Sequence, residues 1–225
     1  MDKALDALVV VVCILLLLIG VYSLLDELWL YENALDKSLL IYRPDLDEPL
    51  GDDKKISENQ VAWLCVFDTD IDYPVMQGAD NFEYLNKDPY GEFKLSGSIF
   101  LDYRSDRNLT DAYSVIYGHH MERGAMFGAL DAFKERDYFD AHRTGRIVTE
   151  AAVYDYELFA VAYADAGNQT LFSPHGRTTS EILEYLKQNS LIYTDHEEGR
   201  IVALSTCSGD NSLTRLLVFG VIKEQ

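Results

Sequence analysis

The chain has 225 residues, which is room for one domain of about 150–200 residues and an additional segment. Hydrophobic residues make up 48% of it and charged residues 25%, a composition that excludes a mostly disordered chain. The formal net charge is −19, so the protein would repel nucleic-acid phosphates and we expect no nucleic-acid partner. The cysteines at positions 13, 65 and 207 lack the spacing of a metal site or a disulfide framework.

An uninterrupted apolar segment, residues 7–25, predicts a membrane-spanning helix. It holds no charged residue, and as an α-helix it reaches about 28 Å, close to the ~30 Å hydrocarbon core of a bilayer. A buried core helix is rarely apolar on every face for five turns, and no small-residue cleavage site of a signal peptide follows. We therefore expect an uncleaved anchor within residues 1–25. The charge of Lys3 favours a cytoplasmic N-terminus and an extracellular remainder.

The rest of the chain predicts a juxtamembrane segment and a mainly β domain. Residues 26–42 have an amphipathic helical pattern and 43–58 hold two prolines and many acids, so we assign 26–58 to a helix and linker and 59–225 to the second domain. Eight β-rich runs with turn signals between them suggest a closed barrel or a sandwich. These runs are 61–67, 73–77, 97–103, 113–117, 146–149, 153–163, 200–206 and 215–222. Helices are expected at 81–86, 125–138 and 180–188, the last capped by Thr179 or Ser180.

The segment RIVALSTC, residues 200–207, has the alternation of a strand that ends at a cysteine. A turn-forming sequence follows, and Arg215 begins the next apolar run. If the two strands pair antiparallel, Arg215 lies beside Cys207, where a guanidinium favours a thiolate or a developing oxyanion. Taken alone, each residue has a commoner structural interpretation: an inert buried thiol and a solvated strand arginine. Sequence leaves a disulfide between Cys65 and Cys207 open.

The segment YSVIYGHHM, residues 113–121, predicts a strand that runs into a glycine and two histidines. Histidine exchanges protons near neutral pH, and a Cys and a His on neighbouring strand ends are what thiol catalysis requires. The alternatives are a solvated loop and a metal site. Adjacent residues point apart and no further ligand stands at metal spacing, so we expect no metal here.

The order of these motifs resembles the sortases, the membrane-anchored cysteine transpeptidases of Gram-positive bacteria. ALSTC at 203–207 followed by Arg215 is similar to the family's TLxTC signature, with Ala203 in place of the first Thr, and YGH at 117–119 is similar to its upstream histidine motif. DYPVMQG at 72–78, GSIFLDYR at 97–104 and MFG at 126–128 resemble class B in the same order, so the likeness covers about residues 61–222. The resemblance implies an eight-stranded sortase-type β-barrel with several peripheral helices, preceded by the transmembrane helix.

The resemblance also implies roles for particular residues. Cys207 matches the nucleophile, His119 the acid/base and Arg215 the group that stabilises the oxyanion, while His120 is expected to be structural. Implied substrate-binding positions are Asn81, Leu85, Tyr117, Ser205, Ser208, Leu171 and Phe172.

The implied partners lie outside the cell. The substrate is the sorting-signal peptide of secreted surface proteins, with an Asn- or Ser-led motif that contains Pro and Thr. The implied acceptor is an amine of a peptidoglycan precursor or of a pilin, and the resemblance implies no metal and no organic cofactor. A thiol peptidase that releases its substrate to water and a non-catalytic membrane-anchored binding domain are the alternatives.

Overall fold

The computed structural model describes residues 3–34, 37–121, 124–207 and 213–225, and its contacts divide the chain into the units Met1–Asp36 and Lys37–Gln225. The first unit is the helix α1 (Lys3–Ala34). Its segment Leu5–Leu25 has a mean hydropathy of 3.1 and is long and apolar enough to cross a membrane.

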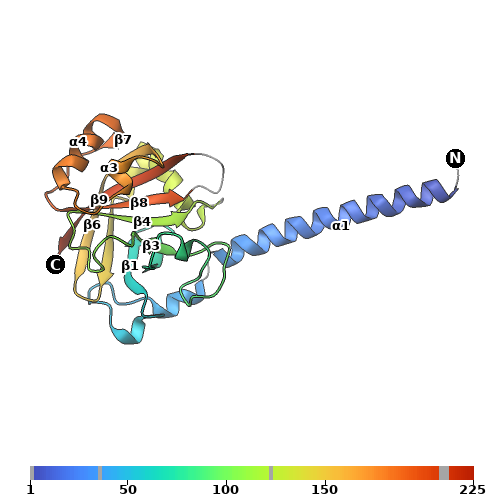
Figure 1. The fold of residues 1–225 in the computed structure, drawn as a ribbon, viewed down its shortest axis with the longest axis horizontal. Helices are drawn as coiled ribbons and strands as arrows, with labels where there is room; N and C mark the ends of the chain where they lie inside the picture. Colours follow the sequence, from blue (N-terminus) through green and yellow to red (C-terminus); the bar gives the residue numbers. More distant parts are fainter. Residues whose placement is uncertain (1–2, 35–36, 122–123, 208–212) are drawn as a thin grey trace. The chain divides into compact units, whose positions relative to one another are not determined.

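The second unit is built on a closed β-barrel (Figure 1). Eight strands follow one another in the order β5-β1-β2-β3-β4-β8-β9-β6, and pairing of β5 with β6 closes the ring. The predicted eight-stranded barrel is thus confirmed. The strands are β1 (Gln60–Val66), β2 (Asp72–Met76), β3 (Ile99–Leu101), β4 (Tyr113–His119), β5 (Thr144–Thr149), β6 (Val153–Asp165), β8 (Arg200–Cys207) and β9 (Thr214–Glu224).

A ninth strand, β7 (Ser190–Tyr193), was not predicted and lies outside the ring. It pairs with the second half of β6, next to the stretch of β6 that pairs with β5. A strand of four residues is too short for its alternation of apolar and polar side chains to be detected in the sequence.

Both faces of the barrel wall are buried, and strand alternation sorts the side chains between them. One cluster receives residues from all eight ring strands, among them Ile116, Val202 and Leu204, and fills the interior. A second cluster holds Tyr117 and Ala203 and lies on the outer face under α3 (Gln169–Phe172) and α4 (Thr179–Asn189). Within the described residues the other helices are η1 (Lys37–Tyr42), η2 (Asp52–Lys54), η3 (Glu83–Leu85), η5 (Phe127–Lys134) and α2 (Arg136–Ala141).

The cap of α4 differs from the predicted Thr179 or Ser180. Thr178 is the N-cap, because its hydroxyl accepts from the Glu181 amide while the Glu181 carboxylate accepts from the Thr178 amide. This reciprocal arrangement is a capping box, which satisfies two amides at the start of the helix.

The segment before β1 packs against the barrel. The Leu50 amide donates to the Thr149 carbonyl at 2.9 Å, and the Leu50 side chain is buried with Trp63. Arg43 Nε lies 2.7 Å from Asp72 Oδ2 on β2. Residues from Lys37 onward accordingly belong to the barrel unit.

Candidate active site

Three strand ends bring the predicted catalytic positions into one row. β4 and β8 are parallel, and His119 and Cys207 are register partners at the last position of each strand. β8 and β9 are antiparallel with Ser205 opposite Leu217, and Thr206 Oγ1 accepts from the Leu216 amide at 3.1 Å. Two residues beyond the last of these pairs, the same antiparallel register leads to Cys207 on β8 and Arg215 on β9. Neighbouring strands lie about 4.8 Å apart, so the backbones of all three residues are close together. The side chain of Cys207 lies outside the described residues.

A glycine fixes the backbone immediately before His119. A Cβ added at Gly118 would lie 2.4 Å from Ile99 Cδ1 and 2.7 Å from the Phe127 ring. Both of these side chains are buried, so neither has room to move aside. Only glycine allows β4 to approach β3 and η5 this closely.

One hydrogen bond orients the imidazole of His119. Its Nε2 lies 2.7 Å from the carbonyl oxygen of Leu85, at the end of η3. A carbonyl oxygen only accepts hydrogen bonds, so Nε2 carries the proton in this geometry. In this tautomer the lone pair lies on the other ring nitrogen, Nδ1.

His120 has a different partner from His119. Its Nε2 lies 2.8 Å from Asp131 Oδ2, and the other oxygen of Asp131 lies 3.0 Å from Lys134 Nζ. Its expected structural role stays a prediction.

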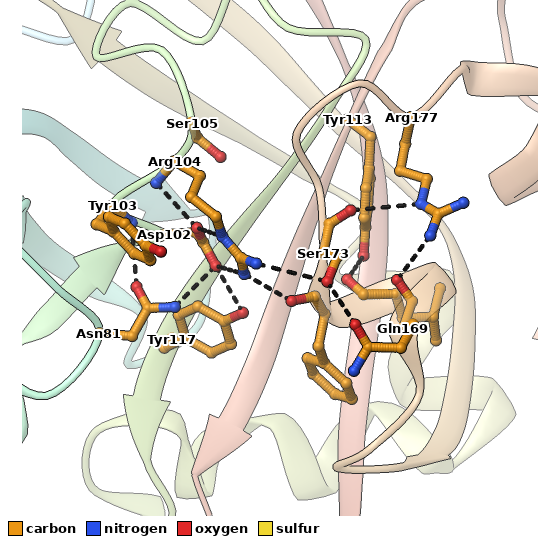
Figure 2. Close-up of polar contacts among 12 residues, drawn as sticks. Asn81, Asp102, Tyr103, Arg104, Ser105, Tyr113, Tyr117, Gln169, Ser173 and Arg177 are labelled. Atoms are coloured by element: carbon orange, nitrogen blue, oxygen red, sulfur yellow. Dashed lines mark hydrogen bonds and ion pairs between the residues drawn. The ribbon is translucent and has the colours of Figure 1, made fainter.

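Two of the predicted substrate-binding residues, Asn81 and Tyr117, donate to a single carboxylate, that of Asp102 (Figure 2). Asn81 Nδ2 donates to Asp102 Oδ2 at 2.9 Å and the Tyr117 hydroxyl donates to the same oxygen at 3.1 Å. The ring of Phe172 stacks on that of Tyr117, with 6.4 Å between centroids. Asn81, Tyr117 and Phe172 therefore form one connected group.

The other predicted substrate-binding residues have separate environments. Leu85 is half-buried next to His119. Ser205 is fully buried, and so is Leu171, whose carbonyl accepts from the Tyr113 hydroxyl at 3.0 Å. Ser208 lies outside the described residues.

Two residues of this site, Asp102 and Arg104, were not predicted to take part in it. Asp102 is 0% exposed, and its carboxylate accepts from both Nε and Nη2 of Arg104, at 2.9 and 2.8 Å. Burial alone would raise the pKa of Asp102, but hydrogen bonds from Arg104 and Asn81 outweigh burial and hold the pKa below its usual value. The sequence signal was a pair of opposite charges directly after the apolar run of β3.

The closed barrel, with a Cys and a His aligned at neighbouring strand ends, defines a cysteine enzyme of the sortase type. A Sortase domain model matches residues 64–223, and the chain belongs to the sortase family, whose members are cysteine transpeptidases.

Relatives of class B match the chain. Sortase B of Listeria monocytogenes is 33% identical over 198 residues, covering 79% of this chain and 80% of the relative. The structure of a Streptococcus pyogenes class B sortase involved in pilus biogenesis is 39% identical with a TM-score of 0.68, covering 75% of this chain and 94% of its own. A Staphylococcus aureus sortase B–substrate complex is 25% identical with a TM-score of 0.73, covering 86% and 94%. The class B resemblance seen in the sequence is thereby confirmed.

Proposed function

We propose that Cys207 is the nucleophile, His119 the acid/base and Arg215 the oxyanion-stabilising group of this transpeptidase. The observation that supports the proposal is the register of β4, β8 and β9. His119 is the pairing partner of Cys207, and Arg215 lies two residues before Leu217, the partner of Ser205. The Cys207 thiolate attacks a Thr carbonyl of the sorting signal, and Arg215 donates hydrogen bonds to the resulting oxyanion. One such donor supplies about 3–4 kcal/mol of transition-state stabilisation.

His119 protonates the departing amine in this scheme. Because Nε2 is engaged by the Leu85 carbonyl, the proton travels through Nδ1. A thioacyl-enzyme remains at Cys207, and an incoming amine gives up a proton to Nδ1 as it attacks the thioester. Leu85 therefore acts as the group that orients the base, through its backbone rather than through its side chain.

The substrate we propose is the sorting-signal peptide of a secreted protein, bound in an extended form beside the row of catalytic residues. The substrate complex of the Staphylococcus aureus relative supports a peptide ligand. Asn81, Tyr117, Phe172 and Leu85 are the residues we expect to face it. Leu171, which is buried beneath this group, would support it, and contacts from Ser205 and Ser208 stay predictions.

The acceptor we propose is an amine of a peptidoglycan precursor or of a pilin. The pilus-related relative from Streptococcus pyogenes supports the pilin amine as one of these two. An acceptor of either kind lies at the outer face of the cell membrane.

We further propose that residues 1–25 anchor the enzyme with its N-terminus in the cytoplasm, that 26–58 connect the anchor to the catalytic domain, and that 59–225 carry the active site outside the cell. The apolar segment Leu5–Leu25 supports the anchor. Tethering would raise the effective concentration of the enzyme where both of its substrates are exported.

The test is transfer of a peptide to an amine by the full chain in detergent. A library of Asn- or Ser-led peptides with Pro and Thr is incubated with and without a glycine-peptide amine, and products are read by mass spectrometry. We expect cleavage after Thr and a ligated product in the presence of the amine. Cleavage without any ligated product would indicate the peptidase alternative instead.

The matched control compares two cysteines of the same chain. Cys65 is a free, buried cysteine on β1, beside Arg43, so Cys65→Ala should retain ligation. Cys207→Ala should abolish it. Ligation by the Cys207→Ala variant would overturn the assignment of the nucleophile.

A further inference from the structure

The carboxylate of Asp102 is a fully buried charge with five hydrogen-bond donors around it. Oδ1 accepts from the amide and Nε of Arg104, at 3.0 and 2.9 Å. Oδ2 accepts from Arg104 Nη2, Asn81 Nδ2 and the Tyr117 hydroxyl, at 2.8, 2.9 and 3.1 Å. Asp102 directly follows β3. Through Asn81 and Tyr117, its carboxylate connects the segment before η3 to β4.

The guanidinium of Arg104 extends this network to a third segment (Figure 2). Nη2 also donates to the Phe172 carbonyl at 2.7 Å, and Nη1 lies 3.4 Å from Ser173 Oγ. These acceptors lie at the end of α3, 68 and 69 residues further along the chain. Asn81, Tyr117 and Phe172 come from three separate segments, and the Asp102–Arg104 pair contacts all of them.

The network also fixes which way the Asn81 amide faces. Asn81 Oδ1 accepts from the Tyr103 amide at 3.0 Å while Nδ2 donates to Asp102, so a flipped amide would lose both bonds. The remaining N–H of Nδ2 and the second lone pair of Oδ1 therefore have set directions. The Tyr117 proton is committed in the same way, because a carboxylate can only accept it.

A buried ion pair is a poor source of net stability, because desolvation offsets most of the attraction between the charges. What the Asp102–Arg104 pair contributes is a fixed geometry, because the planar guanidinium donates two hydrogen bonds to the carboxylate.

We propose that Asp102 and Arg104 are positioning residues that set recognition of the sorting signal by holding Asn81, Tyr117 and Phe172 in one arrangement. They do so without touching the reacting atoms. This inference rests on the proposed function, because it takes those three side chains to face the peptide.

The test uses the full chain in detergent, with kcat and KM measured for the best peptide of the Asn- or Ser-led library. Asp102→Asn removes one acceptor oxygen and presents an N–H group to the donors of Arg104. Arg104→Lys keeps the charge but has no fork to reach both Asp102 and the Phe172 carbonyl. Loss of about one hydrogen bond at the site corresponds to a KM about tenfold higher, with kcat changed by less than about threefold.

A second readout separates positioning from general damage. The rate at which iodoacetamide alkylates Cys207, and the pH profile of that rate, require the thiol and His119 but not the peptide site. We expect both to match the wild type in the two variants. Asp72→Asn is the matched control, because the Asp72 carboxylate on β2 also accepts hydrogen bonds from an arginine and one further donor. These donors are Arg43, in the segment before β1, and Trp63 on β1. Asp72→Asn should lower the melting temperature and leave KM unchanged.

Two results would overturn the proposal. One is an unchanged KM in folded Asp102→Asn, and the other is a fall in the alkylation rate and in kcat that accompanies the rise in KM. If Asp102→Asn does not fold, Arg104→Lys is judged by the same criteria. Failure of the proposed function has its own signature, since the wild type would then show no Cys207-dependent cleavage at all.

Discussion

At the scale of single residues, the site depends on a residue without a side chain at a tightly packed position. Gly118 is the clearest case, because its missing side chain lets the backbone before His119 lie against Ile99 and Phe127. We predict that Gly118→Ala pushes β4 away from η5, at a cost of about 1–3 kcal/mol in unfolding free energy. Displacement of His119 should lower kcat/KM by at least ~10-fold. Peptide cleavage and thermal melting measure the two effects.

The control for that prediction is Gly167→Ala. A Cβ at Gly167 meets only the end of the Asp165 side chain, at 3.0 Å. Activity close to wild type in both alanine variants would show that the close approach at Gly118 does not position His119.

Asp102 makes a prediction about pH. Its pKa is lower in the folded protein than in the unfolded chain, so the native state binds this proton less readily. The group therefore stabilises the fold above the unfolded pKa of about 3.9, and that contribution is lost as the pH falls through the lower folded value. We predict that the unfolding free-energy difference between wild type and Asp102→Asn is full at pH 6 and shrinks below about pH 4. Urea titrations measure it, and a difference that grows towards low pH would contradict the assigned sign.

At the scale of elements, the sequence predicted all eight ring strands because their alternation and turns are local. It also predicted that Cys207, His119 and Arg215 lie close together, because each stands at the end of a predicted strand. It did not show that both faces of β8 are covered. Ser205, which the resemblance places at the peptide, is fully buried, and its contact with the peptide stays a prediction. The role of Arg104 was out of reach for another reason: its partner Phe172 is 68 residues away.

The segment before β1 makes a prediction at the same scale. Leu50 and Arg43 tie it to β5 and β2, although its prolines and acids had indicated a linker. We predict that a chain beginning at residue 59 is less stable than one beginning at Lys37 by at least ~2 kcal/mol, since it loses a buried leucine. That corresponds to a melting temperature lower by at least about 4 °C. Equal melting temperatures would show that the segment packs without stabilising the barrel.

At the scale of the whole molecule, the contacts separate an apolar helix from a barrel unit with its own core. We predict that residues 37–225 stay in the soluble fraction and cleave free peptide with a kcat/KM within about twofold of the full chain. The full chain should sediment with membranes, because burying its apolar segment is strongly favourable. Fractionation and peptide kinetics measure the two effects. A folded but inactive fragment would contradict the prediction that the barrel unit carries the activity by itself.

The chemistry at position 207 is tested most directly by intact-mass and peptide-mapping mass spectrometry of the enzyme during turnover. With a cleavable peptide and no amine, we predict a mass increase equal to the acyl part of the peptide, carried by the Cys207 fragment and removed by hydroxylamine. An acyl group on any other residue, or turnover that leaves Cys207 unmodified while peptide is cleaved, would contradict the thioester at this strand end.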